Sequence, residues 1–234
     1  MRYSRLYLNR PDNQSTDADT VVVIDVLRSF TTTAVALARG ALAVYPVEDP
    51  ASVMTTCARI ERAVSVGAVA GGAPVPGFDY GNSPSALAHA DLAGRNVVIS
   101  TVAGVRGLHL FRRARHLFAG SLVCARATAE AIREAGGDHV CFVITGEWTD
   151  RDGDEDIACA DYIESLLRGE SRSPEAFARR VRQSDFGARF AAGTWPNLPT
   201  ADLDIVAQSD LFGFAMPVRD EAEELVIRRY DRSF

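Results

Sequence analysis

The chain has 234 residues, and its contents of 47% hydrophobic and 24% charged residues are those of an ordinary soluble globular protein. The net charge of −6 argues against a general affinity for nucleic acid, so we expect no nucleic-acid partner. The sequence lacks a signal-peptide core, an apolar run of membrane-spanning length and a CxxC pair among its four cysteines. We therefore expect a cytoplasmic protein with free thiols and without a membrane partner.

Strand and helix patterns alternate through the first 170 residues. A short edge strand is expected at 3–8, and apolar, β-branched runs then predict parallel strands, several of them buried on both faces. These strands are expected at 20–25, 41–47, 66–70, 95–101, 115–119 and 138–145. Helices are expected after the first of them, ending near 39, and at 50–64, 83–90, 102–113, 122–135 and 157–168. The alternation predicts a three-layer, doubly wound α/β fold with a mostly parallel sheet.

The pattern changes after Gly169. Two short helices rich in arginine are predicted within 172–190, and a third helix at 201–210. The stretches 211–217 and 225–229 are predicted to form a terminal pair of strands. We expect residues 1–170 to be the α/β core that carries the site. Residues 171–234 are expected to form a smaller C-terminal lobe packed on it, either as a separate unit or as part of the same domain.

Polar side chains follow the predicted parallel strands at the edge where doubly wound sheets bind ligands. Asp25 and Arg28 come after the first buried strand, and Thr101 and Arg106 come at and after the end of the strand at 95–101. A carboxylate there suits a hard divalent cation, although Asp25 taken alone is more simply explained as a helix cap. All 25 basic residues are arginine, so a basic side chain that grips an anion must be a guanidinium group.

The loop GFDYGNSP at 77–84 contains an acid, an amide, a hydroxyl and two glycines within eight residues. Asn82 or Ser83 is predicted to cap a helix that begins near Pro84. A helix start beside glycine is suited to bind an anion, and Asp79 adds a carboxylate. An ordinary capped loop explains the stretch equally well when it is taken alone.

The acidic loop at 150–156 precedes the predicted helix at 157–168. It is not an EF-hand, because Gly153 falls between the second and third candidate ligands and Asp161 takes the place of the final glutamate. Glu155 and Asp156 either bind a metal or position water, or they are acids favoured by the helix dipole at a helix start. Both interpretations stay open at this point.

Five stretches, taken in order, resemble one family, the 2-phosphosulfolactate phosphatases, also called ComB. They are VVIDVLRSFTT at 22–32, GFDYGNSP at 77–84, STVAGVRGL at 100–108, AGSL at 119–122 and EDIACA at 155–160. The resemblance implies magnesium-dependent hydrolysis of 2-phosphosulfolactate to sulfolactate and phosphate, which in archaea is a step of coenzyme M synthesis. It therefore implies Mg²⁺ as the cofactor and a small-molecule phosphate ester as the substrate, and it leaves a homodimer open.

The resemblance also implies roles for nine residues. Catalytic roles fall to Asp25, Arg28, Asp79 and Glu155, substrate binding to Asn82, Ser83, Thr101 and Arg106, and magnesium ligation to Asp25, Glu155 and Asp156. Arg28 and Arg106 are expected to clamp the phosphate and the second anionic group of the substrate.

The chain departs from the family pattern at three places. The segment AGGAPVP at 70–76 lacks the family's acid, apolar residues replace an amide and a hydroxyl between Thr101 and Arg106, and Asp161 replaces a glycine. Two alternatives therefore stay open beside the phosphosulfolactate phosphatase. One is a non-catalytic homologue that binds another phosphorylated or sulfonated metabolite, and the other is a hydrolase of a different phosphate ester.

Overall fold

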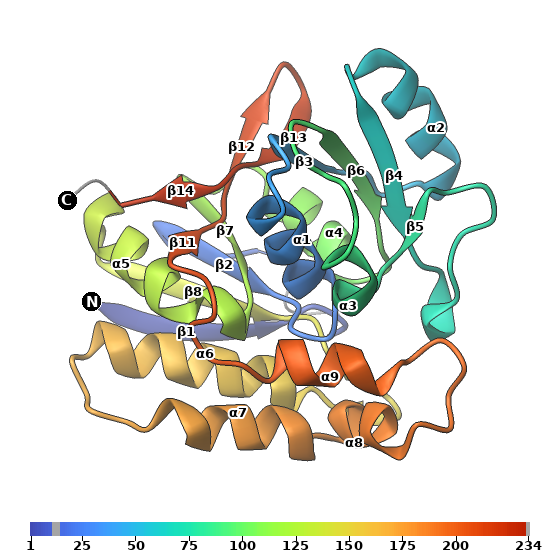
Figure 1. The fold of residues 1–234 in the computed structure, drawn as a ribbon. Coiled ribbons are helices and arrows are strands. Elements are labelled where there is room, and N and C mark those ends of the chain that lie inside the picture. Colours follow the sequence, from blue (N-terminus) through green and yellow to red (C-terminus); the bar gives the residue numbers. More distant parts are fainter. Residues whose placement is uncertain (11–14, 233–234) are drawn as a thin grey trace.

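The computed structural model (Figure 1) describes residues 1–10 and 15–232. Its largest sheet has ten strands: β1 (Arg2–Tyr7), β2 (Thr20–Ile24), β3 (Ala43–Pro46), β4 (Ala63–Gly67), β5 (Tyr80–Gly81), β6 (Asn96–Ser100), β7 (His116–Gly120), β8 (His139–Ile144), β12 (Pro217–Glu221) and β13 (Glu224–Ile227). Their order is β1-β8-β2-β7-β12-β13-β3-β6-β4-β5. Neighbouring strands are parallel except in the pairs that involve β12 or β13. The mostly parallel sheet predicted from the sequence is confirmed.

Helices cover both faces of this sheet and complete the predicted three layers (Figure 1). They are α1 (Ser29–Ala38), α2 (Pro50–Arg59), α3 (Pro84–Leu87), α4 (Gly104–Leu110), α5 (Ala125–Ala135), α6 (Asp154–Leu167), α7 (Pro174–Gln183), α8 (Asp185–Ala192) and α9 (Thr200–Val206), with 3₁₀ turns η1 (Ala70–Gly72) and η2 (Leu122–Cys124). Two small ladders pair β9 (Glu147–Trp148) with β10 (Arg151–Asp152) and β11 (Phe214–Ala215) with β14 (Tyr230–Asp231). None of the helices within the described ranges combines the length and the apolarity that crossing a bilayer demands.

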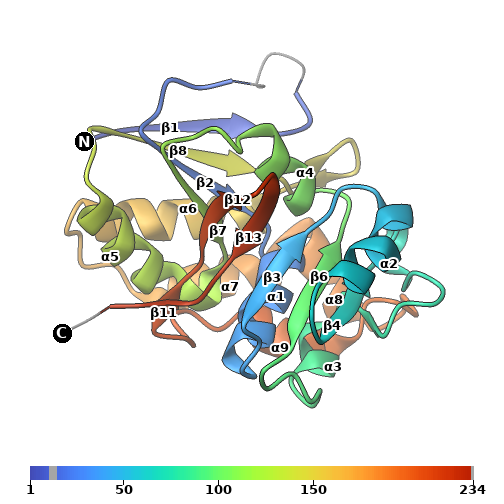
Figure 2. The same ribbon diagram turned by 90° about the horizontal axis from the view of Figure 1, so that it is seen from above.

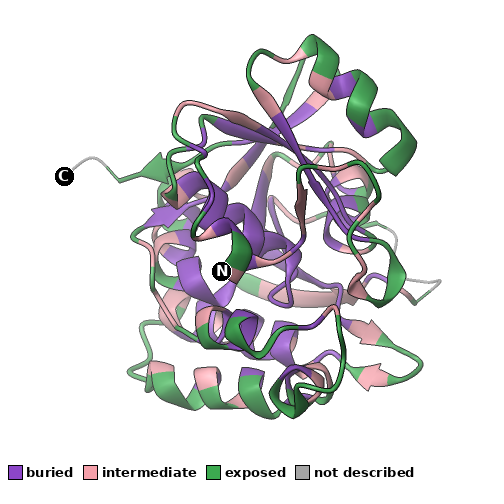
Figure 3. Cartoon of the chain, turned by 45° about the vertical axis from the view of Figure 1, so that its right-hand side comes forward, coloured by how far each residue is buried: buried purple, intermediate pink, exposed green. Residues whose placement is uncertain are grey.

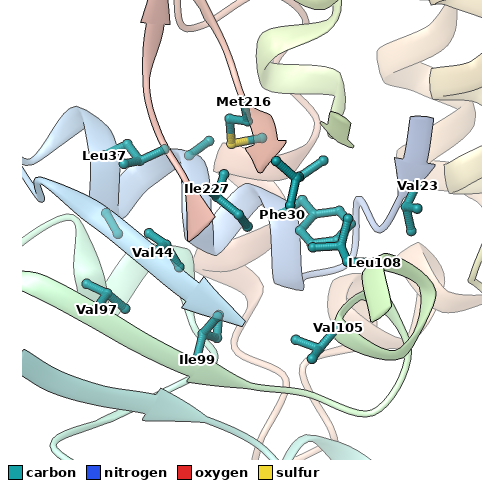
Figure 4. Packing of buried hydrophobic residues seen from close by; sticks show 14 of the residues in the cluster. Val23, Phe30, Leu37, Val44, Val97, Ile99, Val105, Leu108, Met216 and Ile227 are labelled. Carbon is teal, nitrogen blue, oxygen red and sulfur yellow. The ribbon is translucent and has the colours of Figure 1, made fainter. Parts of the chain in front are cut away.

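Strand β2 is buried on both faces and separates two hydrophobic cores. Val21 and Val23 belong to the first core, whereas Val22 and Ile24 belong to the second. The first core lies between the strands, α1 and α4, and Figure 4 shows Phe30 of α1 within it. Helices α5 to α9 cover the second core, and Figure 3 shows that the outer faces of the peripheral helices are exposed. Burial on both sides therefore explains the unbroken apolar run of this strand.

The C-terminal hairpin lies in the middle of the sheet, between two groups of parallel strands (Figure 2). β12 pairs with β7 through Val218 and Leu117, and β13 pairs with β3 through Ile227 and Val44. Of the strands predicted at 211–217 and 225–229, the second matches β13, whereas the first covers β11 and only the first residue of β12, and the insertion of the hairpin into the sheet was not predicted. Since Val218 and Ile227 are buried, the hairpin removes apolar side chains from water there. Residues from 171–234 thus contribute to both hydrophobic cores.

The sheet curves so that the carboxyl ends of β2 and β6 meet, although four strands separate them in the sheet order. Ser29 Oγ, after β2, donates a hydrogen bond to Thr101 Oγ1, after β6, over 2.9 Å. The backbone N–H of Gly104 donates to Asp25 Oδ2 over 3.0 Å. These contacts bring the loops after two distant strands to one place.

Candidate active site

A pocket of about 330 Å³ opens at the carboxyl ends of β2, β4 and β6, and we call it the strand-end pocket. Its walls come from the loops after these strands, the β9–β10 ladder, α8 and the link to α9. The polar and charged lining residues are Asp25, Arg28, Ser29, Asn82, Thr101, Asp150, Arg151 and Arg189. The large apolar lining residues are Leu27, Val69, Val102, Trp148, Phe186, Trp195 and Leu198. Four of the nine residues predicted from the sequence, Asp25, Arg28, Asn82 and Thr101, therefore line one cavity.

Asp25 is almost fully buried, and both of its carboxylate oxygens accept backbone hydrogen bonds. Oδ1 accepts from the N–H of Ser29 in the first turn of α1, and Oδ2 accepts from the N–H of Gly104, each over 3.0 Å. Residue 104 has to be glycine, because a Cβ there would lie 2.7 Å from Asp25 Oδ2. Asp25 thus caps α1, as one interpretation of the sequence predicted, while it also forms part of the pocket wall.

Arg28 is held in place by Asp202, a residue of α9. Its Nη1 donates to Asp202 Oδ2 over 2.8 Å, and the two side chains are 5% and 0% exposed. The other oxygen, Asp202 Oδ1, accepts from Ser83 Oγ over 2.7 Å and from Ser85 N over 3.0 Å. This network orients the guanidinium group and ties the loop after β2 to the loop at 77–84 and to α9.

The loop at 77–84 supplies one side chain to the pocket and uses another structurally. Asn82 is buried and lines the pocket, and its Oδ1 has no hydrogen-bond partner among the described residues. Ser83 caps α3, because its Oγ accepts from Ala86 N over 3.3 Å. Asn82 therefore keeps an acceptor for a ligand, whereas the predicted substrate-binding residue Ser83 serves the capping and the Asp202 network.

Two buried acids lie at the start of α6, beside the carboxyl end of β8. Asp156 accepts hydrogen bonds from Val26 N over 2.8 Å and from Gly146 N over 2.7 Å. Burial, and then the carboxylates of Glu155 and Asp25, raise the pKa of Asp156, and these hydrogen bonds oppose the rise. Burial raises the pKa of Glu155 to about 7, and its Oε2 has no hydrogen-bond partner among the described residues. Asp156 is therefore close to Asp25 and to Glu155, and neither Glu155 nor Asp156 lines the pocket.

The donor chemistry of these acids fits a magnesium ion in part. No group of three or more His, Cys, Asp or Glu side chains within residues 1–10 and 15–232 is arranged to hold a metal. Mg²⁺ is, however, commonly bound by one or two carboxylates, with water and substrate phosphate as its other ligands. Asp25 lines the pocket, and Glu155 has an unpartnered buried oxygen, so these two carboxylates fit such a partial set.

Asp79 and Arg106, like Ser83, Glu155 and Asp156, do not line the strand-end pocket. Asp79 Oδ2 accepts hydrogen bonds from Ser65 N and Ser65 Oγ, both over 2.8 Å, which ties its loop to β4. Arg106 is exposed and donates to Asn9 Oδ1 over 3.3 Å. It lines a neighbouring groove of about 320 Å³ that shares Thr101 with the pocket. The structure therefore directs Asp79 away from the other candidates, whereas Arg106 meets Thr101 in a groove that adjoins the pocket and shares Val69 and Val102 with it.

Sequence reasoning missed most of the pocket wall, including two arginines and two tryptophans. Trp148 and Arg151 come from the β9–β10 ladder, and Arg189 and Trp195 come from α8 and the link after it. Arg151 lies among the acids of the loop at 150–156, whose carboxylates are the more evident candidates, and no motif covers the segment with Arg189. The sequence carried one signal for them, a tryptophan near an arginine in each of two turn-rich segments, and the structure shows Trp148 and Trp195 to be 37% and 46% exposed.

Comparison with known proteins gives a consistent result. The sequence model of a family described as 2-phosphosulpholactate phosphatase matches residues 8–192. A probable 2-phosphosulfolactate phosphatase from Carboxydothermus hydrogenoformans is 41% identical over 63% of this chain, and the match spans 60% of that protein's length. Proteins of the same name from Thermoplasma volcanium and Bacillus subtilis are 30% and 27% identical, over 81% and 91% of this chain and 84% and 92% of their own.

Proposed function

The chain belongs to the 2-phosphosulfolactate phosphatase family, and we propose that its strand-end pocket hydrolyses the phosphate ester of a small anionic acid. The expected substrate is 2-phosphosulfolactate, which yields sulfolactate and phosphate. The observation that carries the proposal is the meeting of Asp25, Arg28 and Asn82 in one cavity, since a carboxylate, a guanidinium group and an unpartnered amide oxygen arrive from two separate loops. Positioning and charge stabilisation provide most of the catalysis in phosphoryl transfer.

Each side chain has a distinct task in this reaction. Arg28, which Asp202 holds in a fixed orientation, binds the phosphate oxygens and stabilises the charge that builds up on them. Glu155, whose pKa is raised to about 7 by burial in the metal-free protein, suits a general base for the attacking water when it does not ligate Mg²⁺. Asp25 and Glu155 are the residues that would hold Mg²⁺, which when bound neutralises phosphate charge and polarises the ester. The water oxygen attacks phosphorus as the ester P–O bond breaks, and the proton removed from the water is passed on to the leaving alkoxide of the acid.

A non-catalytic binding protein on the same fold is the second candidate. It is favoured by the backbone hydrogen bonds that engage both oxygens of Asp25 and both oxygens of Asp156, since these give the two acids a structural explanation. The same pocket would then hold a phosphorylated or sulfonated metabolite without turning it over.

Phosphate release separates the two candidates. We expect release from 2-phosphosulfolactate in the presence of Mg²⁺ and none in EDTA. Asp25→Asn should lower the rate by about 100-fold or more, whereas Asp91→Asn, the same change at an exposed carboxylate, should leave it unaltered. An unchanged rate in Asp25→Asn would remove Asp25 from the mechanism. Absence of release from a panel of phospho-acids, together with thermal stabilisation by the same compounds, would favour the binding protein. Release from another phosphate ester only would reassign the substrate.

A further inference from the structure

Arg151 is a charged residue of the strand-end pocket that the proposed mechanism leaves unused. It lies on β10, opposite Trp148 on β9. Its guanidinium carbon lies 4.2 Å from the ring centroid of Phe186 and 5.5 Å from that of Trp148. Stacking on aromatic rings holds a guanidinium plane in place, and its N–H edge stays able to bind oxygen atoms. Arg151 is therefore a preorganised cation in the wall of the pocket.

Arg151 differs from the two other arginines that line the pocket. Arg28 is paired with Asp202, and Arg189 is paired with Asp150, each over 2.8 Å. Arg151 forms no ion pair within the part of the chain that the structure describes, and its buried Nε has no hydrogen-bond partner there. A buried donor without a partner is costly, and an oxyanion in the pocket would satisfy it.

Glu155 is the buried acid that faces the same region. The charge of Arg151 lowers the pKa of Glu155, against the larger effect of burial, which raises it. Glu155 Oε2 and Arg151 Nε both lack hydrogen-bond partners among the described residues, so the two groups are not joined to each other. Arg151 therefore affects Glu155 through its charge alone, and its Nε–H group stays available to a ligand.

We infer that Arg151 binds the second strongly acidic group of the substrate, the sulfonate, while Arg28 binds the phosphate. This inference rests on the proposed function. The chain has no lysine, so a basic side chain that binds the sulfonate must be an arginine, and a guanidinium group can donate two parallel hydrogen bonds to a sulfonate. Arg106, which the sequence assigned to this task, lies in the neighbouring groove. Arg151 thus makes the pocket specific for phosphate esters that carry a sulfonate.

Two substrates that differ only in the sulfonate test this assignment. 2-Phosphosulfolactate and 2-phospholactate share the phosphate and the carboxylate, and the second compound has a methyl group in place of the sulfonated carbon. Arg151→Gln should lower kcat/KM for 2-phosphosulfolactate by about 10- to 100-fold, chiefly through KM, and should change kcat/KM for 2-phospholactate by less than about threefold. Arg151→Lys, which keeps the charge but not the fork, should fall between. Arg219→Gln, an exposed guanidinium outside the pocket, should alter neither substrate.

The outcomes separate this inference from the function on which it rests. Equal losses on both substrates, or no loss on either, would overturn the inference while the activity of the unmodified protein stands. If the unmodified protein hydrolyses neither compound, 2-phosphosulfolactate fails as the proposed substrate, and calorimetric titration with sulfolactate and with lactate then decides about Arg151. Arg151→Gln should weaken sulfolactate binding about 10-fold or more and leave lactate binding unaltered. Unaltered sulfolactate binding would end the assignment. Thermal melts of each variant show whether the protein is folded.

Discussion

The buried ion pair between Arg28 and Asp202 should make a measurable contribution to stability. The two groups are 2.8 Å apart, and their side chains are 5% and 0% exposed. Asp202→Asn leaves the guanidinium charge buried without its partner, and such a loss costs about 3–5 kcal/mol. The asparagine oxygen can still accept a hydrogen bond from Ser83, so the loss reports mainly the charge. We expect the free energy of unfolding to fall by about 3 kcal/mol.

Urea unfolding measures this loss, and Asp204→Asn is the matched control on the same helix. The carboxylate of Asp204 pairs with Arg182 over 3.3 Å, with side chains 70% and 44% exposed, and an exposed pair contributes about 0–1 kcal/mol. A cycle with Arg28→Met, Asp202→Leu and the double variant isolates the coupling. The double variant should be more stable than Asp202→Leu alone, because it buries no unpaired charge. A cost for Asp202→Asn no larger than that for Asp204→Asn would refute the reasoning.

Two further predictions concern Glu155 and the glycine beside Asp25. Burial raises the pKa of Glu155 from 4.5 to about 7, so between these values the folded state binds more protons than the unfolded chain and stability falls as pH rises. In EDTA the free energy of unfolding should therefore drop by about 3 kcal/mol from pH 4.5 to pH 7 relative to Glu155→Gln, and parallel denaturant curves for the two proteins would contradict the raised pKa. Gly104→Ala adds a Cβ 2.7 Å from Asp25 Oδ2 and should lower kcat/KM by about 10-fold or more, because it displaces that carboxylate. The control Gly213→Ala, whose Cβ would have no atom within 4 Å, should leave kcat/KM unaltered. Equal kcat/KM values for the two variants would show that the position of Asp25 is unimportant.

The parallel part of the fold was predictable from the sequence because burial leaves a readable pattern. Strands β2 and β8 are apolar at nearly every position, since each is covered on both faces. The place of the C-terminal hairpin was not predictable. Its local pattern indicates strands, but the pairing of β12 with β7 and of β13 with β3 depends on tertiary contacts that a local pattern does not encode.

The candidate site was predicted in part. Asp25, Arg28 and Thr101 line the pocket because each follows a strand that ends at the same edge, and the family to which their motifs pointed is confirmed. A motif does not show where a side chain turns, and Asp79 turns to β4 while Arg106 turns to a separate groove. Glu155 and Asp156 stay candidates as metal ligands, although neither lines the pocket.

The sequence around Asp202 did not indicate its role, because that role comes from hydrogen-bond partners far away in the chain. It lies 174 residues from Arg28 and 119 residues from Ser83, and it bonds both. The family match ends at residue 192, yet Asp202 orients an arginine of the VVIDVLRSFTT motif and a serine of the GFDYGNSP motif. The segment after the match therefore supports the site that the match contains. Substitutions in this segment should therefore preserve the fold only if an acid on α9 still reaches the buried guanidinium group of Arg28. Without that counter-charge, the buried arginine would lower the stability of the protein.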